Sequence, residues 1–140
     1  MDRVTRLNAI AFAVLLCQAT LMESAVAELP PGAYKELKSK ASDVVKLRIL
    51  NVTSEEPNKG YLRLECTGEV LSVTRSKSGM KKGDKIRFRS YHWTLGMPPP
   101  GPRNPPLIRK GWKGLVYLKT VEGKKDFEIA AYGESFVTSK

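Results

Sequence analysis

Two arginines and two aromatic residues alternate along one short segment of the chain. They are Arg87, Arg89, Tyr91 and Trp93. In an extended strand all four side chains lie on one face, and the two arginines lie about 7 Å apart, which suits neighbouring anionic groups on a polymer. Flat rings beside them can stack on bases or sugars. The pattern predicts a polyanion-binding face; the alternative is a solvated outer face whose rings lie under a neighbouring loop.

A proline-rich segment follows this face and carries further arginines. Most of the nine prolines of the chain lie within residues 94–111. Prolines favour an extended, pre-stiffened backbone that suits recognition at a low entropic cost, and loops of this length are usually functional or disordered. We expect Arg103 and Arg109 to contact a ligand from this loop. The alternative is a rigid plug over one end of a barrel, anchored by Leu107 and Ile108.

The sequence shows no recognisable catalytic or metal-binding motif. His92 is the only histidine and has no nearby acidic residue, so we expect a structural histidine that is buried or hydrogen-bonded. A G-x-S-x-G elbow, a P-loop and an H-E-x-x-H motif are absent from the sequence. Cys17 and Cys66 are too few for a zinc site of four thiolates. We therefore expect no catalytic residue, no metal and no cofactor; a hydrolase with an unrecognised site is the enzymatic alternative.

Alternating apolar and polar residues predict the strands that position these groups. Five strands are expected, the first from Asp43 and the others over residues 61–73, 85–93, 113–121 and 126–132. The apolar pair Ile49 and Leu50 interrupts the alternation of the first strand and predicts a bulge. Gly68 within the second strand is typical of a bend at a barrel corner.

The apolar positions of these strands predict the core. The expected inward-facing residues include Leu47, Leu64, Phe88 and Ile129. Cys66 shares a face with Leu64, and free cysteine is among the residues most often buried, so we expect a buried thiol. Phe136, which follows the fifth strand, is expected to fold back as a plug.

These elements predict an all-β fold, a small five-stranded closed barrel with a long proline-rich loop between strands 3 and 4. The "GDKIRF" strand, the loop, the "KGLVYL" strand and the final "AAYGESF" follow in an order that resembles an OB-fold. More narrowly, residues 43–136 are similar to the netrin-like barrels that include the tissue inhibitors of metalloproteinases. The inhibitory mechanism of that family needs an N-terminal cysteine, and Glu28 stands at the predicted mature terminus, so no residue inherits that role. The prolines also exclude the helix usual between the third and fourth strands of an OB-fold.

The first 27 residues have the parts of a secretory signal peptide. An arginine-containing start precedes an apolar stretch at residues 10–16, and the small residues Ala25 and Ala27 follow. Cleavage after Ala27 would leave residues 28–140 without a transmembrane span, secreted or in the periplasm. Lipid attachment at Cys17 is the less favoured alternative, because a large residue, Leu16, precedes that cysteine.

The predicted mature chain divides into two parts. Residues 28–42 form an entry segment in which residues 34–41 have room for at most two helical turns. Residues 43–140 form the OB-like barrel domain. The asparagine of the triplet Asn51-Val52-Thr53 is a glycosylation acceptor only in a eukaryotic secretory route.

The charge balance indicates the class of ligand. The chain holds 24 Lys and Arg against 14 Asp and Glu, a formal net charge of +10. Outside the cytosol, such a charge suits lipid head groups, cell-wall polymers or anionic glycans rather than nucleic acid. We therefore expect an exported, non-catalytic binding module for an anionic envelope polymer or a protein partner. The alternative is an inhibitor or accessory subunit that acts through the proline-rich loop.

Overall fold

The computed structural model describes residues 28–96, 101–123 and 125–139. The predicted signal peptide and the lipid-attachment alternative at Cys17 lie outside these residues. The elements in chain order are α2 (Pro31–Lys40), β1 (Asp43–Asn58), β2 (Tyr61–Ser76), β3 (Lys85–Trp93), β4 (Lys113–Thr120), β5 (Phe127–Ile129), the 3-10 helix η1 (Tyr132–Ser135) and β6 (Phe136–Thr138). Within the described ranges, no helix has the length and apolar character needed to span a bilayer.

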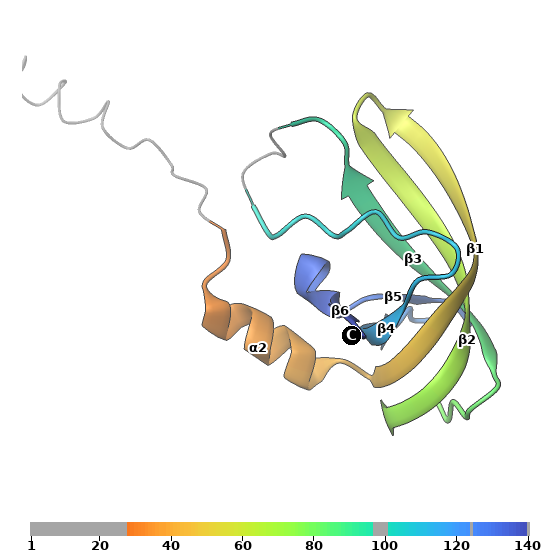
Figure 1. Cartoon of the computed structure of the whole chain (residues 1–140). Coiled ribbons are helices and arrows are strands. Elements are labelled where there is room, and N and C mark those ends of the chain that lie inside the picture. The colour runs from red at the N-terminus through yellow and green to blue at the C-terminus, as the bar shows by residue number, and fades with distance from the viewer. Residues whose placement is uncertain (1–27, 97–100, 124, 140) are drawn as a thin grey trace, which may run out of the picture.

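Five strands close into a barrel (Figure 1). Hydrogen-bonded neighbours follow in the order β1-β2-β3-β5-β4, and β4 pairs with β1 to complete the ring. The β3–β5 pair is parallel and the other pairs of the ring are antiparallel. The predicted five-stranded closed barrel is confirmed. An unpredicted strand, β6, lies outside the ring and pairs with β4.

Long, bent strands allow so few strands to close the barrel. Ile49 pairs with Gly68 and Asn51 pairs with Thr67, so Leu50 is an extra residue in β1 and the predicted bulge is confirmed. A Cβ atom at Gly68 would lie 3.4 Å from Leu47 Cδ1. That is ordinary van der Waals contact, so close approach of the strands does not by itself require a glycine where β2 pairs with the bulge of β1.

The barrel interior holds the predicted apolar residues. Leu47 and Leu64 are fully buried, and Phe88 and Ile129 expose at most 9% of their surface. Phe136 folds back toward this core as expected, with its ring centroid 6.3 Å from that of Phe88. Phe136 is the first residue of β6. This strand pairs with residues 114–116 of β4, and β5 pairs with residues 118–120 of the same strand.

The fifth strand is shorter than predicted. The sequence pattern extends it to Tyr132, but β5 ends at Ile129. The hydroxyl of Ser135 accepts a hydrogen bond from the Ala131 N–H at 2.7 Å, and Tyr132 takes a left-handed φ of 50° as η1 begins. This local hydrogen bond replaces a ladder bond, so the chain turns before it pairs again as β6.

The N-terminal helix is longer than predicted. α2 starts at Pro31, within the Pro-Gly segment, and has 10 residues. Proline suits the first turn of a helix because the missing N–H would have no partner there. Tyr34 is the buried residue of α2, and its hydroxyl accepts a 2.6 Å hydrogen bond from the Arg103 N–H. The helix is thus fastened to the proline-rich loop.

The described second half of the proline-rich loop covers the edge of β3. The side-chain amide of Asn104 accepts from the Trp93 N–H and donates to the Trp93 carbonyl, both at 3.0 Å. His92 Nδ1 donates to the Pro105 carbonyl at 2.7 Å, so His92 is hydrogen-bonded as expected. Ile108 is buried, whereas Leu107 remains 38% exposed. Of the two residues expected to anchor this loop, Ile108 is therefore packed into the protein and Leu107 is not, and Pro105 is a second, fully buried contact.

The Cys66 thiol should react slowly in the native protein. Cys66 is buried, as predicted, and burial raises the pKa of its thiol to about 12. Because the thiolate is the nucleophile, we expect maleimide labelling of Cys66 at about pH 8 to be at least about a hundredfold slower than in denaturant. Peptide mapping separates this cysteine from Cys17. Equal rates in both conditions would show that the thiol is accessible.

Candidate binding cleft on the outer face of the barrel

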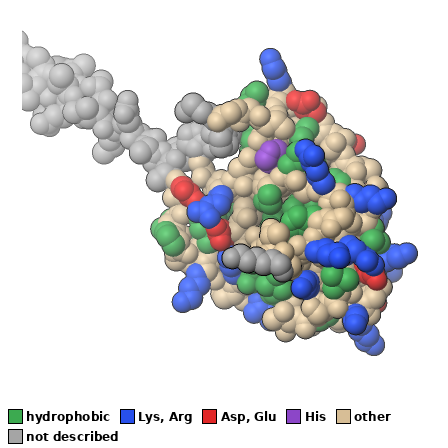
Figure 2. All heavy atoms as spheres, viewed as in Figure 1, with side chains coloured by type: hydrophobic (Ala, Val, Ile, Leu, Met, Phe, Trp, Pro, Cys, Tyr) green, Lys and Arg blue, Asp and Glu red, His purple; other side chains and the backbone are tan. Residues whose placement is uncertain are grey.

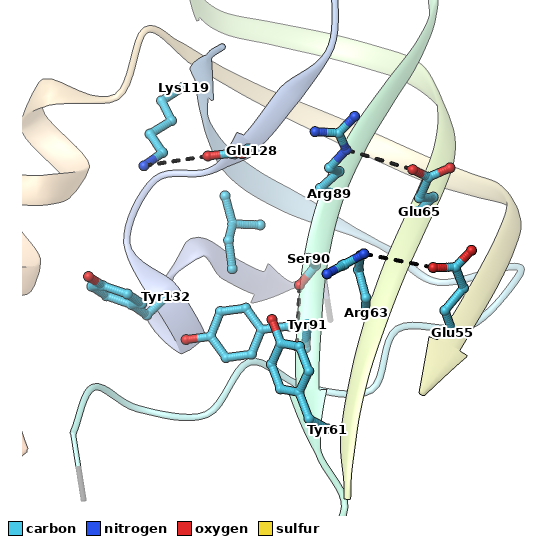
Figure 3. Close-up of a pocket in the computed structure, with 11 residues that line it drawn as sticks. Glu55, Tyr61, Arg63, Glu65, Arg89, Ser90, Tyr91, Lys119, Glu128 and Tyr132 are labelled. Carbon is cyan, nitrogen blue, oxygen red and sulfur yellow. Dashed lines mark hydrogen bonds and ion pairs between the residues drawn. The ribbon is translucent and has the colours of Figure 1, made fainter. Parts of the chain in front are cut away.

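A cleft of about 630 Å³ crosses the outer surface of β2, β3 and β5 (Figure 3). Its lining has two parts, which Figure 3 shows side by side: rings on one side, charged side chains on the other. The strand ladders position both parts, because alternate residues of each strand face outward. In β3, for example, Arg89 and Tyr91 flank the buried Ser90.

The charged part is a row that alternates in sign around the barrel wall. Glu65 pairs in register with Arg89, Arg89 with Glu128, and Glu128 with Lys119. Arg89 Nε lies 3.7 Å from Glu65 Oε1, and Lys119 Nζ lies 3.7 Å from Glu128 Oε2. These separations exceed hydrogen-bond length, so the charged groups keep donors and acceptors free for a ligand.

The aromatic part is the tyrosine group, Tyr61, Tyr91 and Tyr132. The Tyr61 and Tyr91 ring centroids lie 5.8 Å apart, and Tyr61 also packs against Trp93 at 4.8 Å. Burial, with a smaller effect of the neighbouring tyrosines, raises the pKa of Tyr91 to about 12. Its hydroxyl is therefore a neutral donor and acceptor at physiological pH.

Tyr132 reaches the cleft from η1 through an unusual backbone conformation. It is the non-glycine residue with a positive φ among the described residues. A bulky residue pays a strain cost there, and such strain often accompanies a functional position. Its side chain is partly exposed and completes the tyrosine group from the side opposite β2.

Arg63 joins the two parts of the cleft. It pairs in register with Tyr91, and its Nη1 lies 3.8 Å from Glu55 Oε2 on β1. Both side chains of this ion pair are more than half exposed. The pair is therefore weak and can open to let Arg63 contact a ligand.

The four residues predicted on β3 do share its outer face, but one acid, Asp126, offsets part of their positive charge. Arg87 Nη2 lies 3.2 Å from Asp126 Oδ1, and Arg89 Nη2 lies 3.5 Å from Asp126 Oδ2. Arg89 and Tyr91 line the cleft, whereas Arg87 lies beside it and Trp93 packs at a tilt against Tyr61.

The two loop arginines lie away from this face. Arg103 forms ion pairs with Glu28 and Glu134 and lies 5.9 Å from the Tyr34 ring centroid, so it ties α2 to η1. Arg109 lines a separate hollow beside Asn51 of β1. The structure therefore brings together two of the six predicted site residues in the cleft and separates the two loop arginines from it.

The cleft residues outside β3 were not among the predicted site residues. Tyr61 and Arg63 alternate with apolar residues on β2, so their outward direction was visible. Their place opposite Trp93 and Tyr91 depends on strand register. Tyr132 was assigned to a strand that the structure ends earlier.

No group of three or more His, Cys, Asp or Glu side chains in the described part of the chain is placed to hold a metal ion. No known protein-family model matches the chain, and no curated protein is significantly similar to it. The chemistry of the cleft therefore carries the functional proposal.

Proposed function

We propose that the protein is an exported, non-catalytic binding module and that its cleft holds a carbohydrate segment of an envelope polymer. The observation that supports this is the tyrosine group beside a row of alternating charges. Aromatic rings pack on the apolar faces of sugar rings, and carboxylates and guanidinium groups hydrogen-bond to sugar hydroxyls. The OB-like interpretation of the barrel agrees with a ligand on β2 and β3, since strands 2 and 3 of OB-folds bind oligosaccharides and oligonucleotides.

The charges of the cleft favour a ligand with little net charge. Three cationic side chains are each within 4 Å of a carboxylate, in the pairs Arg63 with Glu55, Arg89 with Glu65, and Lys119 with Glu128. A balanced surface attracts a polyanion only weakly, and we expect binding in the cleft to depend little on salt. The net charge of +10 must then act elsewhere on the molecule.

The alternative of a protein partner held by the proline-rich loop has less support. The backbone or side chains of Arg103, Asn104 and Pro105 already contact other parts of the chain. These contacts hold residues 103–105 against the rest of the chain, so a partner on the described half of the loop would meet mainly the exposed residues Pro106, Leu107, Arg109 and Lys110.

Changes in the cleft should weaken binding to a glycan. We expect retention of the protein on at least one of immobilised peptidoglycan, chitin and uncharged β-glucan. The double variant Arg63→Ala with Tyr132→Ala should bind at least about tenfold more weakly, because it loses a ring contact and a charged hydrogen bond worth about 1–3 kcal/mol together.

The matched control is Arg87→Ala, which removes an exposed arginine beside the cleft rather than within it. It should bind like the wild type, and circular dichroism verifies that all variants fold. Retention on none of the three glycans, or equal binding by the double variant, would contradict the proposal.

A further inference from the structure

Cationic side chains gather on another side of the barrel, along β1, β4 and the end of the proline-rich loop. We call this set the cationic stripe: Lys46, Arg48, Arg109, Lys110 and Lys113. In the β1–β4 ladder Arg48 pairs with Lys113. The Ile49 N–H donates to the Trp112 carbonyl and the Ile49 carbonyl accepts from the Gly111 N–H, which brings the loop end to the same strand. Figure 2 shows Lys and Arg outnumbering acidic side chains on the right of the view, where β1 runs.

The stripe lacks the charge balance of the cleft. Arg48 pairs with Glu69 at 2.6 Å, but the other four cations have no carboxylate within 4 Å among the described residues. Like charges placed directly opposite each other in a sheet, as Arg48 and Lys113 are, destabilise the ladder. This uncompensated charge is complementary to an extended anionic surface.

Apolar side chains lie among these cations. On the β4–β6 ladder Leu115 pairs with Val137, which is 46% exposed, and Lys46 pairs with Leu115 from the β1 side. Leu107 is 38% exposed and lines the same hollow as Arg109 and Lys110. A soluble polyanion would contact only the charges, whereas a lipid surface accepts cations at its head groups and apolar side chains at its interface.

We propose that the cationic stripe docks the barrel on a membrane surface that contains anionic phospholipid. Each Lys or Arg near such a surface raises partitioning about fivefold, so four unpaired cations together give an increase of about six hundredfold. The cleft lies mainly on β2, β3 and β5, and none of the five stripe residues lines it, so docking leaves the cleft open to a second ligand. The inference does not depend on the proposed glycan ligand.

Co-sedimentation with lipid vesicles tests the proposal. The full chain should bind vesicles of phosphatidylglycerol and phosphatidylcholine, bind those of phosphatidylcholine alone far less, and dissociate at high salt. The variant Lys110→Glu with Lys113→Glu should bind the anionic vesicles at least about tenfold more weakly. Residues 1–27, with their apolar stretch, are common to every variant, so they cannot produce this difference.

The matched control is Lys81→Glu with Lys82→Glu, which makes the same change of net charge at exposed positions between β2 and β3. It should retain most of the binding, and thermal unfolding verifies the fold of both variants. Equal losses in the two double variants would overturn the proposal, because only net charge would then matter.

The apolar part of the stripe separates a membrane from a soluble polymer. Leu107→Ser with Val137→Ser should weaken binding to anionic vesicles several-fold and leave binding to heparin unchanged. Strong retention on heparin together with no binding to vesicles would overturn the proposal in favour of a soluble polyanion.

Discussion

Replacing Phe88 by alanine should lower the free energy of unfolding by about 3–5 kcal/mol. Phe88 exposes 1% of its surface and pairs in register with Cys66 on β2 and Phe127 on β5. Its ring also approaches Phe136 of β6. Strands on both sides of Phe88 are held in place by ladder hydrogen bonds, so they cannot collapse into the cavity that truncation leaves.

Urea denaturation of wild type and variant measures this loss. Arg87→Ala is the matched control, because the neighbouring side chain faces solvent with 74% exposure and should change stability by less than about 0.5 kcal/mol. A loss below about 1 kcal/mol for Phe88→Ala would mean that β3 presents the opposite face to the core.

Asp43 carries the second large expected effect. Its buried carboxylate accepts hydrogen bonds from the hydroxyls of Ser42 and Ser76 at 2.6 Å, and from the hydroxyl and N–H of Ser78 at 2.7 and 3.2 Å. These bonds fasten the start of β1 to the end of β2. Burial alone would raise the pKa of Asp43, but the hydrogen bonds outweigh burial and hold the pKa below its usual value.

Asp43→Ala should cost about 2–4 kcal/mol near pH 7, because three serine hydroxyls lose their acceptor. A pKa that is lower in the folded state stabilises the fold above the unfolded pKa of about 3.9, and this contribution is lost as the pH falls through the folded pKa. Asp43→Asn keeps the shape of the side chain without its charge.

The stability gap between wild type and Asp43→Asn should therefore narrow as the pH falls from about 5 toward 2. Urea denaturation of both proteins across this range measures the gap. Other acids, such as Glu134, whose pKa is also lowered, titrate in both proteins, so their contributions cancel in the difference. A gap that stays constant with pH would show that the carboxylate charge contributes nothing to stability.

The side on which each residue lies could be predicted from the sequence, because strand alternation is a local property. Leu64 and Phe88 face inward as the pattern requires, and even the extra residue Leu50 is visible as a break in the alternation. The composition of the cleft was not predictable in this way. Asp126 reaches Arg87 and Arg89 only through the parallel pairing of β3 with β5.

Two predicted element boundaries, the start of the helix and the end of the fifth strand, were wrong for the same reason. In both, contacts with neighbouring residues outweigh the local sequence pattern. Helical turns were expected only over residues 34–41, yet Pro30 and Pro31 occupy the positions at which the helix begins. Alternation through Ala131 and Tyr132 predicted a continuing strand. In the structure the Ala131 N–H donates to the Ser135 hydroxyl instead of to a neighbouring strand. Side-chain to backbone hydrogen bonds of this kind leave no periodic trace in a sequence.

The contact between Asn104 and Trp93 bears on how the protein ages. Asparagine converts to aspartate mainly when the backbone nitrogen of the next residue attacks its side-chain carbonyl. The next residue is Pro105, whose nitrogen carries no hydrogen, so this route is closed. Aspartate at this position would set a carboxylate against the Trp93 carbonyl and lose the donor that now contacts it. Pro105 thus protects the side-chain amide of Asn104 from slow hydrolysis. This amide holds the loop against the edge of β3.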